Sequence, residues 1–107
     1  MNRLALAALL SLSLAAFAQD APDVAITIKD HKFSPDRIEV PAGKKVKLVV
    51  DNQDATPEEF ESHPLKVEKV IPGKSKATIF IGPLKAGEYK FVGEFNEKTA
   101  KGVIVAK

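Results

Sequence analysis

The sequence contains no cysteine and no tryptophan, and its single methionine is Met1. Without cysteine the chain can form no disulfide bond, so its stability must come from core packing or from a bound metal or partner. A metal site that depends on a thiolate ligand is excluded for the same reason. The chain has 16 basic and 14 acidic residues, a net charge of +2. This near balance does not favour nucleic acid or an anionic membrane surface as a partner.

Motifs of enzymes are also missing. There is no serine in a strand-turn-helix context, no glycine-rich phosphate loop and no His-Glu-x-x-His zinc motif. The sequence therefore gives no direct sign of catalysis. An oxidase activity on Fe(II) would require a bound redox metal.

The N-terminal apolar run, residues 4–16, is too short to span a membrane, which takes roughly 20 residues. Arg3 precedes it, and Ala16 and Ala18 give the small-x-small pattern that signal peptidase accepts. We therefore expect a signal peptide at 1–18, export to the periplasm, and cleavage after Ala18. A buried N-terminal helix is the alternative. The product, 19–107, is expected to be one domain, soluble and without a lipid anchor because no cysteine follows the cleavage site.

Residues beyond the apolar run alternate between apolar and polar side chains, with Pro and Gly turn signals between the segments. The segments that this alternation predicts as strands are 24–28, a broken strand at 33–40, 46–50, 58–61, 65–71, 76–81, 89–95 and 102–106. No window shows helical periodicity, so we predict an all-β fold, a Greek-key antiparallel β-sandwich of about seven or eight strands. Tyr89 follows a loop that contains Gly87, as expected for a tyrosine corner.

Three motifs resemble the cupredoxin superfamily: FSPDRIEVPAG at 33–43, DNQDATPEEF at 51–60, and GEYKF at 87–91 followed by Lys-Gly at 101–102. The resemblance implies a cupredoxin-like fold. It also implies places for the four ligands of a blue-copper site. These places hold Glu58 and Asn96 where histidines are expected, Gly93 where cysteine is expected, and a residue near Thr99 where methionine is expected. With no thiolate, a blue-copper centre is excluded.

A narrower resemblance, to the EfeO-type cupredoxin-like group, rests on Glu-Phe-Glu at 59–61, KVEKVIPG at 66–73 and FVGEF at 91–95. Proteins of this group work in periplasmic iron-uptake systems. The resemblance implies a stand-alone protein beside an iron permease and an iron-binding partner. A histidine is expected after Gly-Glu-Phe, and this chain has Asn96 there.

Carboxylates from two distant segments form the candidate metal site. Glu59 and Glu61 are two residues apart, so in a strand they point to the same face, with Phe60 on the other. The cupredoxin resemblance implies that Glu94 meets them at one end of the sandwich, with His63 or His31 as an imidazole ligand. Oxygen and nitrogen ligands of this kind suit Cu(II) or iron rather than Cu(I). The alternative is a set of ordinary surface carboxylates.

Two other acidic residues, Asp54 and Glu58, are expected only to solvate the loop that contains them.

Three functions remain open at this point. The first is a periplasmic accessory protein of iron uptake that holds copper or iron and hands it on. The second is a metal-free interaction module that docks on a transporter or periplasmic partner. The third is a ferroxidase that uses a non-blue copper.

Overall fold

A computed structural model of the protein describes residues 23–107, which form nine strands and one short 3₁₀ helix. The predicted signal peptide and residues 19–22 lie outside this range. In chain order the elements are β1 (Asp23–Lys29), β2 (Lys32–Ser34), β3 (Arg37–Val40), β4 (Val46–Asn52), β5 (Glu58–Ser62), β6 (Val67–Ile71), β7 (Ser75–Ile81), β8 (Gly87–Gly93), η3 (Glu94–Asn96) and β9 (Lys101–Ala106). Within these residues, no helix is long and apolar enough to cross a membrane.

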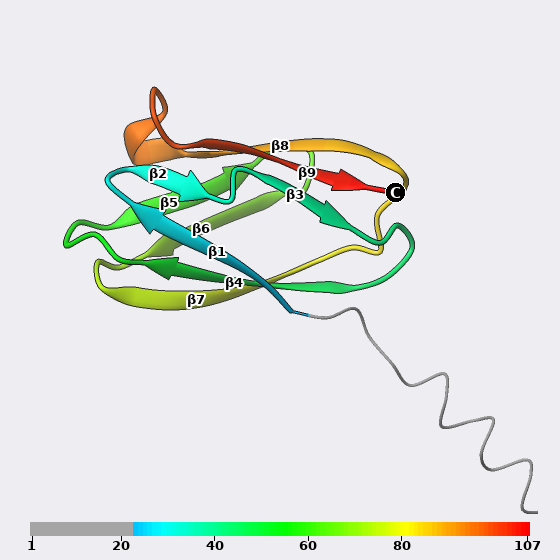
Figure 1. The fold of residues 1–107 in the computed structure, drawn as a ribbon, viewed down its shortest axis with the longest axis horizontal. Coiled ribbons are helices and arrows are strands. Elements are labelled where there is room, and N and C mark those ends of the chain that lie inside the picture. The colour runs from blue at the N-terminus through cyan, green and yellow to red at the C-terminus, as the bar shows by residue number, and fades with distance from the viewer. Residues whose placement is uncertain (1–22) are drawn as a thin grey trace, which may run out of the picture.

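The strands form two sheets that face each other, which confirms the predicted β-sandwich (Figure 1). One sheet has the order β2-β1-β4-β7, and the other has the order β3-β9-β8-β5-β6. Five of the strand pairings are antiparallel, whereas β1 with β4 and β3 with β9 are parallel. The sandwich is therefore mixed rather than purely antiparallel.

The ninth strand arises because the broken segment 33–40 divides between the two sheets. β2 pairs with β1 in one sheet, and β3 pairs with β9 in the other. Pro35 lies between them, and since proline has no backbone N–H it cannot continue a ladder of hydrogen bonds. The predicted strand 89–95 also ends early, at Gly93, because Glu94–Asn96 form η3.

Three phenylalanines from different strands form the centre of the core. The ring centroids of Phe33 and Phe91 lie 4.9 Å apart, and those of Phe60 and Phe91 lie 4.8 Å apart. All three rings are buried, as the alternation along β2, β5 and β8 requires. Around them pack aliphatic side chains from both sheets, including Ile26, Ile28, Leu48, Val50, Ile71 and Ile104.

Hydrogen bonds from side chains fix the connections between strands. The Asn52 amide donates to the carbonyl oxygens of Thr56, Ile71 and Pro72, joining the β4–β5 loop to the end of β6. The Tyr89 hydroxyl donates to the Lys85 carbonyl at 2.7 Å, the contact expected of a tyrosine corner.

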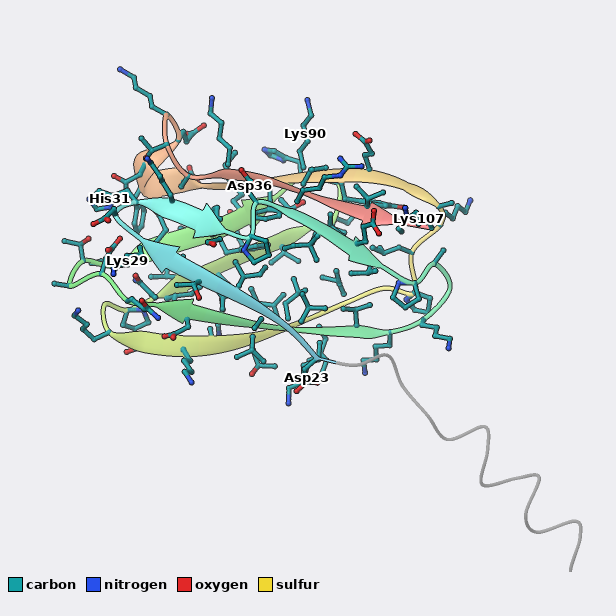
Figure 2. The ribbon with its side chains drawn as sticks, in the orientation of Figure 1. Asp23, Lys29, His31, Asp36, Lys90 and Lys107 are labelled. Carbon is teal, nitrogen blue, oxygen red and sulfur yellow. The ribbon has the colours of Figure 1, made fainter. Side chains whose placement is uncertain are left out.

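The β1–β2 turn, the β4–β5 loop and η3 lie at one end of the sandwich, and the C-terminus lies at the other (Figure 1). Figure 2 shows His31 at the first of these ends and Lys107 at the second. The candidate site residues come from the first end and from the adjoining part of β5, so this end is the region where the site has to be sought.

Candidate metal site

The three candidate glutamates meet on the outer face of the five-stranded sheet. Along β5 the side chains alternate, so that Phe60 is buried while Glu59 and Glu61 face outward, as predicted. β5 pairs with β8 in a register that sets Phe60 opposite Gly93, which brings Glu94 beside Glu59. Glu59, Glu61 and Glu94 each offer one carboxylate oxygen, and these three oxygens lie within 4.8 Å of one another. We call this set the glutamate triad.

Hydrogen bonds within the glutamate triad change the pKa values of its carboxyl groups. A hydrogen bond with Glu94, then partial burial and the charges of Glu94, Glu68 and Glu61, raises the pKa of Glu59 to about 7. The pKa of Glu61 is also raised, first by its hydrogen bond with Glu94. Hydrogen bonds received from Glu59 and Glu61 lower the pKa of Glu94. The triad therefore holds a proton near neutral pH, and a cation could replace that proton.

Glu68 adds a fourth carboxylate that sequence reasoning missed. It lies opposite Glu61 in the β5–β6 pairing, and its charge contributes to the raised pKa values of Glu59 and Glu61. The alternation within 65–71 shows a strand there, but the register of the hairpin decides which residue faces Glu61. Only the length of the turn at 63–66 could have identified Glu68 in advance.

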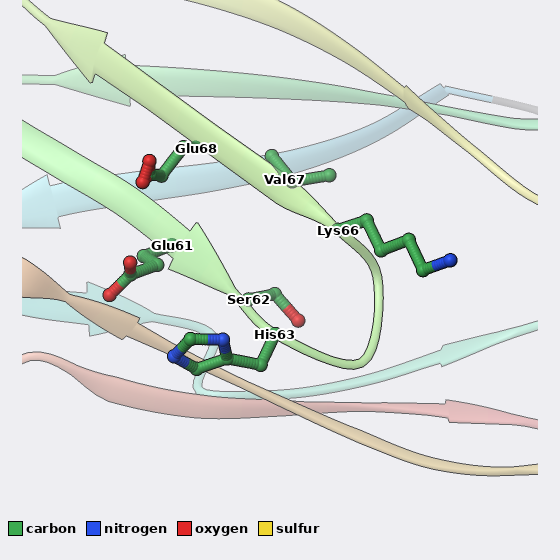
Figure 3. Close-up of a pocket in the computed structure, with 6 residues that line it drawn as sticks. All are labelled: Glu61, Ser62, His63, Lys66, Val67 and Glu68. Carbon is green, nitrogen blue, oxygen red and sulfur yellow. The ribbon is translucent and has the colours of Figure 1, made fainter.

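His63 lies directly after β5, at the edge of the glutamate triad. Its charge opposes the rise in the pKa of Glu61 and adds to the lowering of the pKa of Glu94. It also lines an open cavity of about 270 Å³ together with Glu61, Ser62, Lys66, Val67 and Glu68. Figure 3 shows the His63 ring and the carboxylates of Glu61 and Glu68 on the same side, while the Lys66 amine points away. His63 thus lies next to the triad, but it is not among the three residues whose ligand atoms lie within 4.8 Å of one another.

His31 lies in a different environment from the one predicted. Its Nδ1 atom is 3.5 Å from a carboxylate oxygen of Asp54. The Asp54 carboxylate also accepts hydrogen bonds from the backbone N–H groups of Asp30 and His31, and the bond from His31 is the largest cause of its lowered pKa. The two residues of the tight β1–β2 turn, Asp30 and His31, have positive φ, which is uncommon for residues other than glycine. Asp54 stabilises this turn through its two backbone hydrogen bonds and does not merely solvate its own loop. His31 is not part of the glutamate triad.

Glu58 was also wrongly expected to solvate the loop. Its side chain is 1% exposed and points into the sandwich, on the same face of β5 as Phe60. Its carboxylate accepts hydrogen bonds from the backbone N–H groups of Glu59 and Phe95, both at 2.9 Å, and from the Asn96 amide at 2.7 Å. The period-two alternation with Phe60 was the available signal that this carboxylate is buried.

The residues at the four blue-copper places do not fit that centre. A Cβ atom added to Gly93 would lie 2.6 Å from the Glu58 carboxylate carbon and 2.7 Å from the Ala100 Cβ atom. A cysteine therefore could not replace Gly93 without a shift of its neighbours. Glu58 and Asn96 are bonded to each other, and the Thr99 hydroxyl donates to the Asn96 carbonyl. The glutamate triad lies on the opposite face of β5 from these residues.

Comparison with known proteins gives both family and fold. The family model described as "Cupredoxin-like domain" matches residues 2–106. An uncharacterized protein of Rickettsia prowazekii, RP394, is 47% identical over 83 residues, covering 78% of this chain and 66% of that protein. The chain thus spans about two thirds of the length of this relative.

Solved structures agree with the fold. A copper binding protein in the apo form superposes with a TM-score of 0.70 at 19% identity, covering 86% of this chain and 99% of that one. Auracyanin A, a "blue" copper protein from Chloroflexus aurantiacus, superposes with a TM-score of 0.68 at 12% identity, covering 80% of this chain and 98% of that one. A purple cupredoxin from Nitrosopumilus maritimus superposes with a TM-score of 0.60 at 19% identity, covering 79% of this chain and 100% of that one. At these identities the likeness shows the fold alone.

Proposed function

The chain belongs to the cupredoxin-like domain family, and we propose that it binds a metal ion through glutamate oxygens rather than through the thiolate of a blue-copper centre. The observation that carries this proposal is the glutamate triad, whose three oxygens lie within 4.8 Å of one another. Two segments more than 30 residues apart in sequence supply them, so only the folded chain assembles the set.

The ligand chemistry narrows the choice of ion. Carboxylate oxygens with one neighbouring imidazole suit Fe(II), Fe(III), Mn(II) or a non-blue Cu(II), and not Cu(I). The pKa of Glu59 is raised to about 7, first by its hydrogen bond with Glu94 and then by burial and the neighbouring charges. This supports cation binding, because a cation could take the place of the proton between these carboxyl groups. His63 is the histidine nearest to the triad in sequence, and its charge acts on the carboxyl groups of Glu61 and Glu94.

The wider role we propose is that of an exported accessory protein in iron uptake. In this role the chain works in the periplasm, beside an iron permease and an iron-binding protein. It hands iron to them or, with a bound redox metal, assists the oxidation of Fe(II). Support comes from the resemblance of 59–61, 66–73 and 91–95 to the EfeO-type group and from the signal-like residues 1–18.

Calorimetric titration of the purified protein with Fe(II) without oxygen, and with Mn(II) and Cu(II), tests metal binding. We expect a dissociation constant tighter than about 100 μM, equivalent to about −5.5 kcal/mol. The double variant E59Q/E61Q should weaken binding at least about tenfold. E88Q is the matched control, because Glu88 is an exposed glutamate of β8 outside the triad. No binding by the wild-type protein at 100 μM would rule the proposal out.

Docking without metal is the second candidate function, and one observation favours it. The Phe95 side chain is 52% exposed, directly beside Glu94, although phenylalanine is usually buried. The two functions can be separated by measuring growth on limiting iron of cells that carry either E59Q/E61Q or F95S. Loss of growth only in E59Q/E61Q supports metal binding, whereas loss only in F95S supports docking.

A further inference from the structure

Three of the four places that the cupredoxin resemblance assigns to copper ligands are occupied here by residues in mutual contact. Glu58 is hydrogen-bonded to Asn96, and its carboxylate carbon lies against the Cα atom of Gly93, where no Cβ atom would fit. The absence of a side chain at Gly93 leaves the space that the carboxylate fills. A carboxylate therefore lies among the residues that would surround copper in a blue-copper protein.

This carboxylate is fully engaged with the chain itself. One oxygen accepts the N–H groups of Glu59 and Phe95, and the other accepts the Asn96 amide. Glu58 is buried, and among residues 23–107 no buried side-chain nitrogen or oxygen lacks a hydrogen-bond partner. Such a carboxylate is an anchor between segments and not an open metal ligand.

The two backbone groups that Glu58 holds belong to the triad or adjoin it. Glu59 is a member of the triad, and Phe95 directly follows Glu94. The backbone hydrogen bonds of the β8–β9 connection, in contrast, join residues of that connection to one another. Examples are the bond from the Gly93 N–H to the Ala100 carbonyl and the bond from the Ala100 N–H to the Asn96 carbonyl. Glu58 therefore ties η3 to β5 from the buried side, at the point where Glu94 meets Glu59 on the outer side.

We propose that Glu58 is a positioning residue of the metal site. It is a buried carboxylate that replaces the copper centre of the fold and holds Glu94 where its ligand oxygen lies within 4.8 Å of those of Glu59 and Glu61. This inference rests on the proposed function. Partners that orient metal ligands from behind typically change metal affinity about 10- to 100-fold when removed. Glu58 orients backbone segments, and through them the ligands.

The test compares E58A, E58Q and the E88Q control by two readouts, Mn(II) titration and hydrogen exchange of the Phe95 amide. In E58A we expect Mn(II) affinity to fall about tenfold or more and exchange at Phe95 to accelerate about tenfold or more. E58Q should be close to wild type in both, because the Asn96 amide can turn so that its oxygen accepts the new Gln N–H group. E88Q should change neither.

Each result decides one part of the inference. Unchanged exchange of the Phe95 amide in E58A would refute the anchor. Faster exchange with unchanged Mn(II) affinity would refute the positioning role. If E58A does not fold, N96A removes one of the three hydrogen bonds, and the same two readouts should change in the same directions by about threefold. Absence of wild-type binding to Mn(II), Fe(II) and Cu(II) alike would refute the proposed function and, with it, the positioning role. The exchange readout would still decide on the anchor.

Discussion

Glu59 is the residue whose chemistry depends most on its neighbours. Its side chain is only half-buried, yet a hydrogen bond with Glu94 and the charges around it raise its pKa to about 7. An isolated surface glutamate would titrate near 4.5. The difference therefore reports directly on the convergence of β5 and η3.

Titration of the Glu59 carboxyl carbon by NMR should give a midpoint near pH 7. In E94A the largest cause of the shift is removed, so the midpoint should fall toward 4.5. K98A, which changes an exposed residue beyond η3, is the control and should leave it in place. A wild-type midpoint near 4.5 would show that the two glutamates do not meet in solution.

The same shift predicts how stability varies with pH. A pKa raised in the folded state contributes stability below the unfolded value, and this contribution is lost as pH rises through the folded value. For Glu59 that window runs from about 4.5 to about 7. The pKa values of Glu39 and Asp54 are lowered, so their contributions are lost only as pH falls below their ordinary range.

Urea unfolding at pH 5 and pH 8 measures this effect. The wild-type midpoint should be lower at pH 8, and the decrease should be smaller in E59Q, which carries no ionisable group at that position. Addition of Mn(II) at pH 8 should raise the wild-type midpoint, because a ligand that binds only the folded state stabilises it. An equal decrease in wild type and E59Q would contradict the assignment to Glu59.

At the scale of the strands, Gly102 of β9 pairs with Phe91 of β8, and the Phe91 ring lies over the glycine. A Cβ atom at position 102 would lie 2.2 Å from the Phe91 ring. We therefore expect G102A to destabilise the fold by about 1–3 kcal/mol through overpacking of the core. Urea denaturation of G102A and of the exposed neighbour variant K101A would measure the difference. Equal midpoints for the two would show that the ring moves aside without cost.

At the scale of the strands, the alternation of apolar and polar residues predicted most of the observed elements. The prediction failed where the side-chain pattern alone does not decide the structure. The alternation of β5 correctly placed Phe60 inside and Glu59 outside. It carried the same information about Glu58, but a carboxylate is rarely buried unless it is paired, and its partners on η3 are distant in sequence. The passage of the chain between sheets at Pro35 depends on tertiary pairing, which no local pattern shows.

For the candidate site, the sequence and the cupredoxin resemblance together predicted the three glutamates, and the structure brings them together. They did not predict Glu68, because its position depends on the register of the β5–β6 hairpin. They also suggested His31, which instead pairs with Asp54. A lone histidine has no second ligand in its own segment, so sequence alone could not assign its partner.

At the scale of the whole molecule, the chain combines the sandwich of its family with a sequence that has no cysteine. The chain has no disulfide to add stability, and a triad of like charges costs stability at neutral pH. A bound cation would remove that cost. If the triad binds a cation as proposed, the molecule should therefore be more stable in its metal-bound form.

Export is a separate prediction at this scale. If residues 1–18 are a signal peptide, expression of the full chain in a bacterial host should yield periplasmic protein that begins at Gln19. Intact-mass measurement and N-terminal sequencing would check this. A product that retains Arg3 and stays in the cytoplasm would contradict it.

The most direct test of metal binding at the glutamate triad is paramagnetic broadening of amide signals by Mn(II), added well below one equivalent at pH 7.5. Broadening should appear first at Glu59, Glu61 and Glu94, and E59Q/E61Q should remove it there. Broadening centred on other carboxylates, such as Asp51 or Glu88, or spread evenly over the surface, would contradict the site.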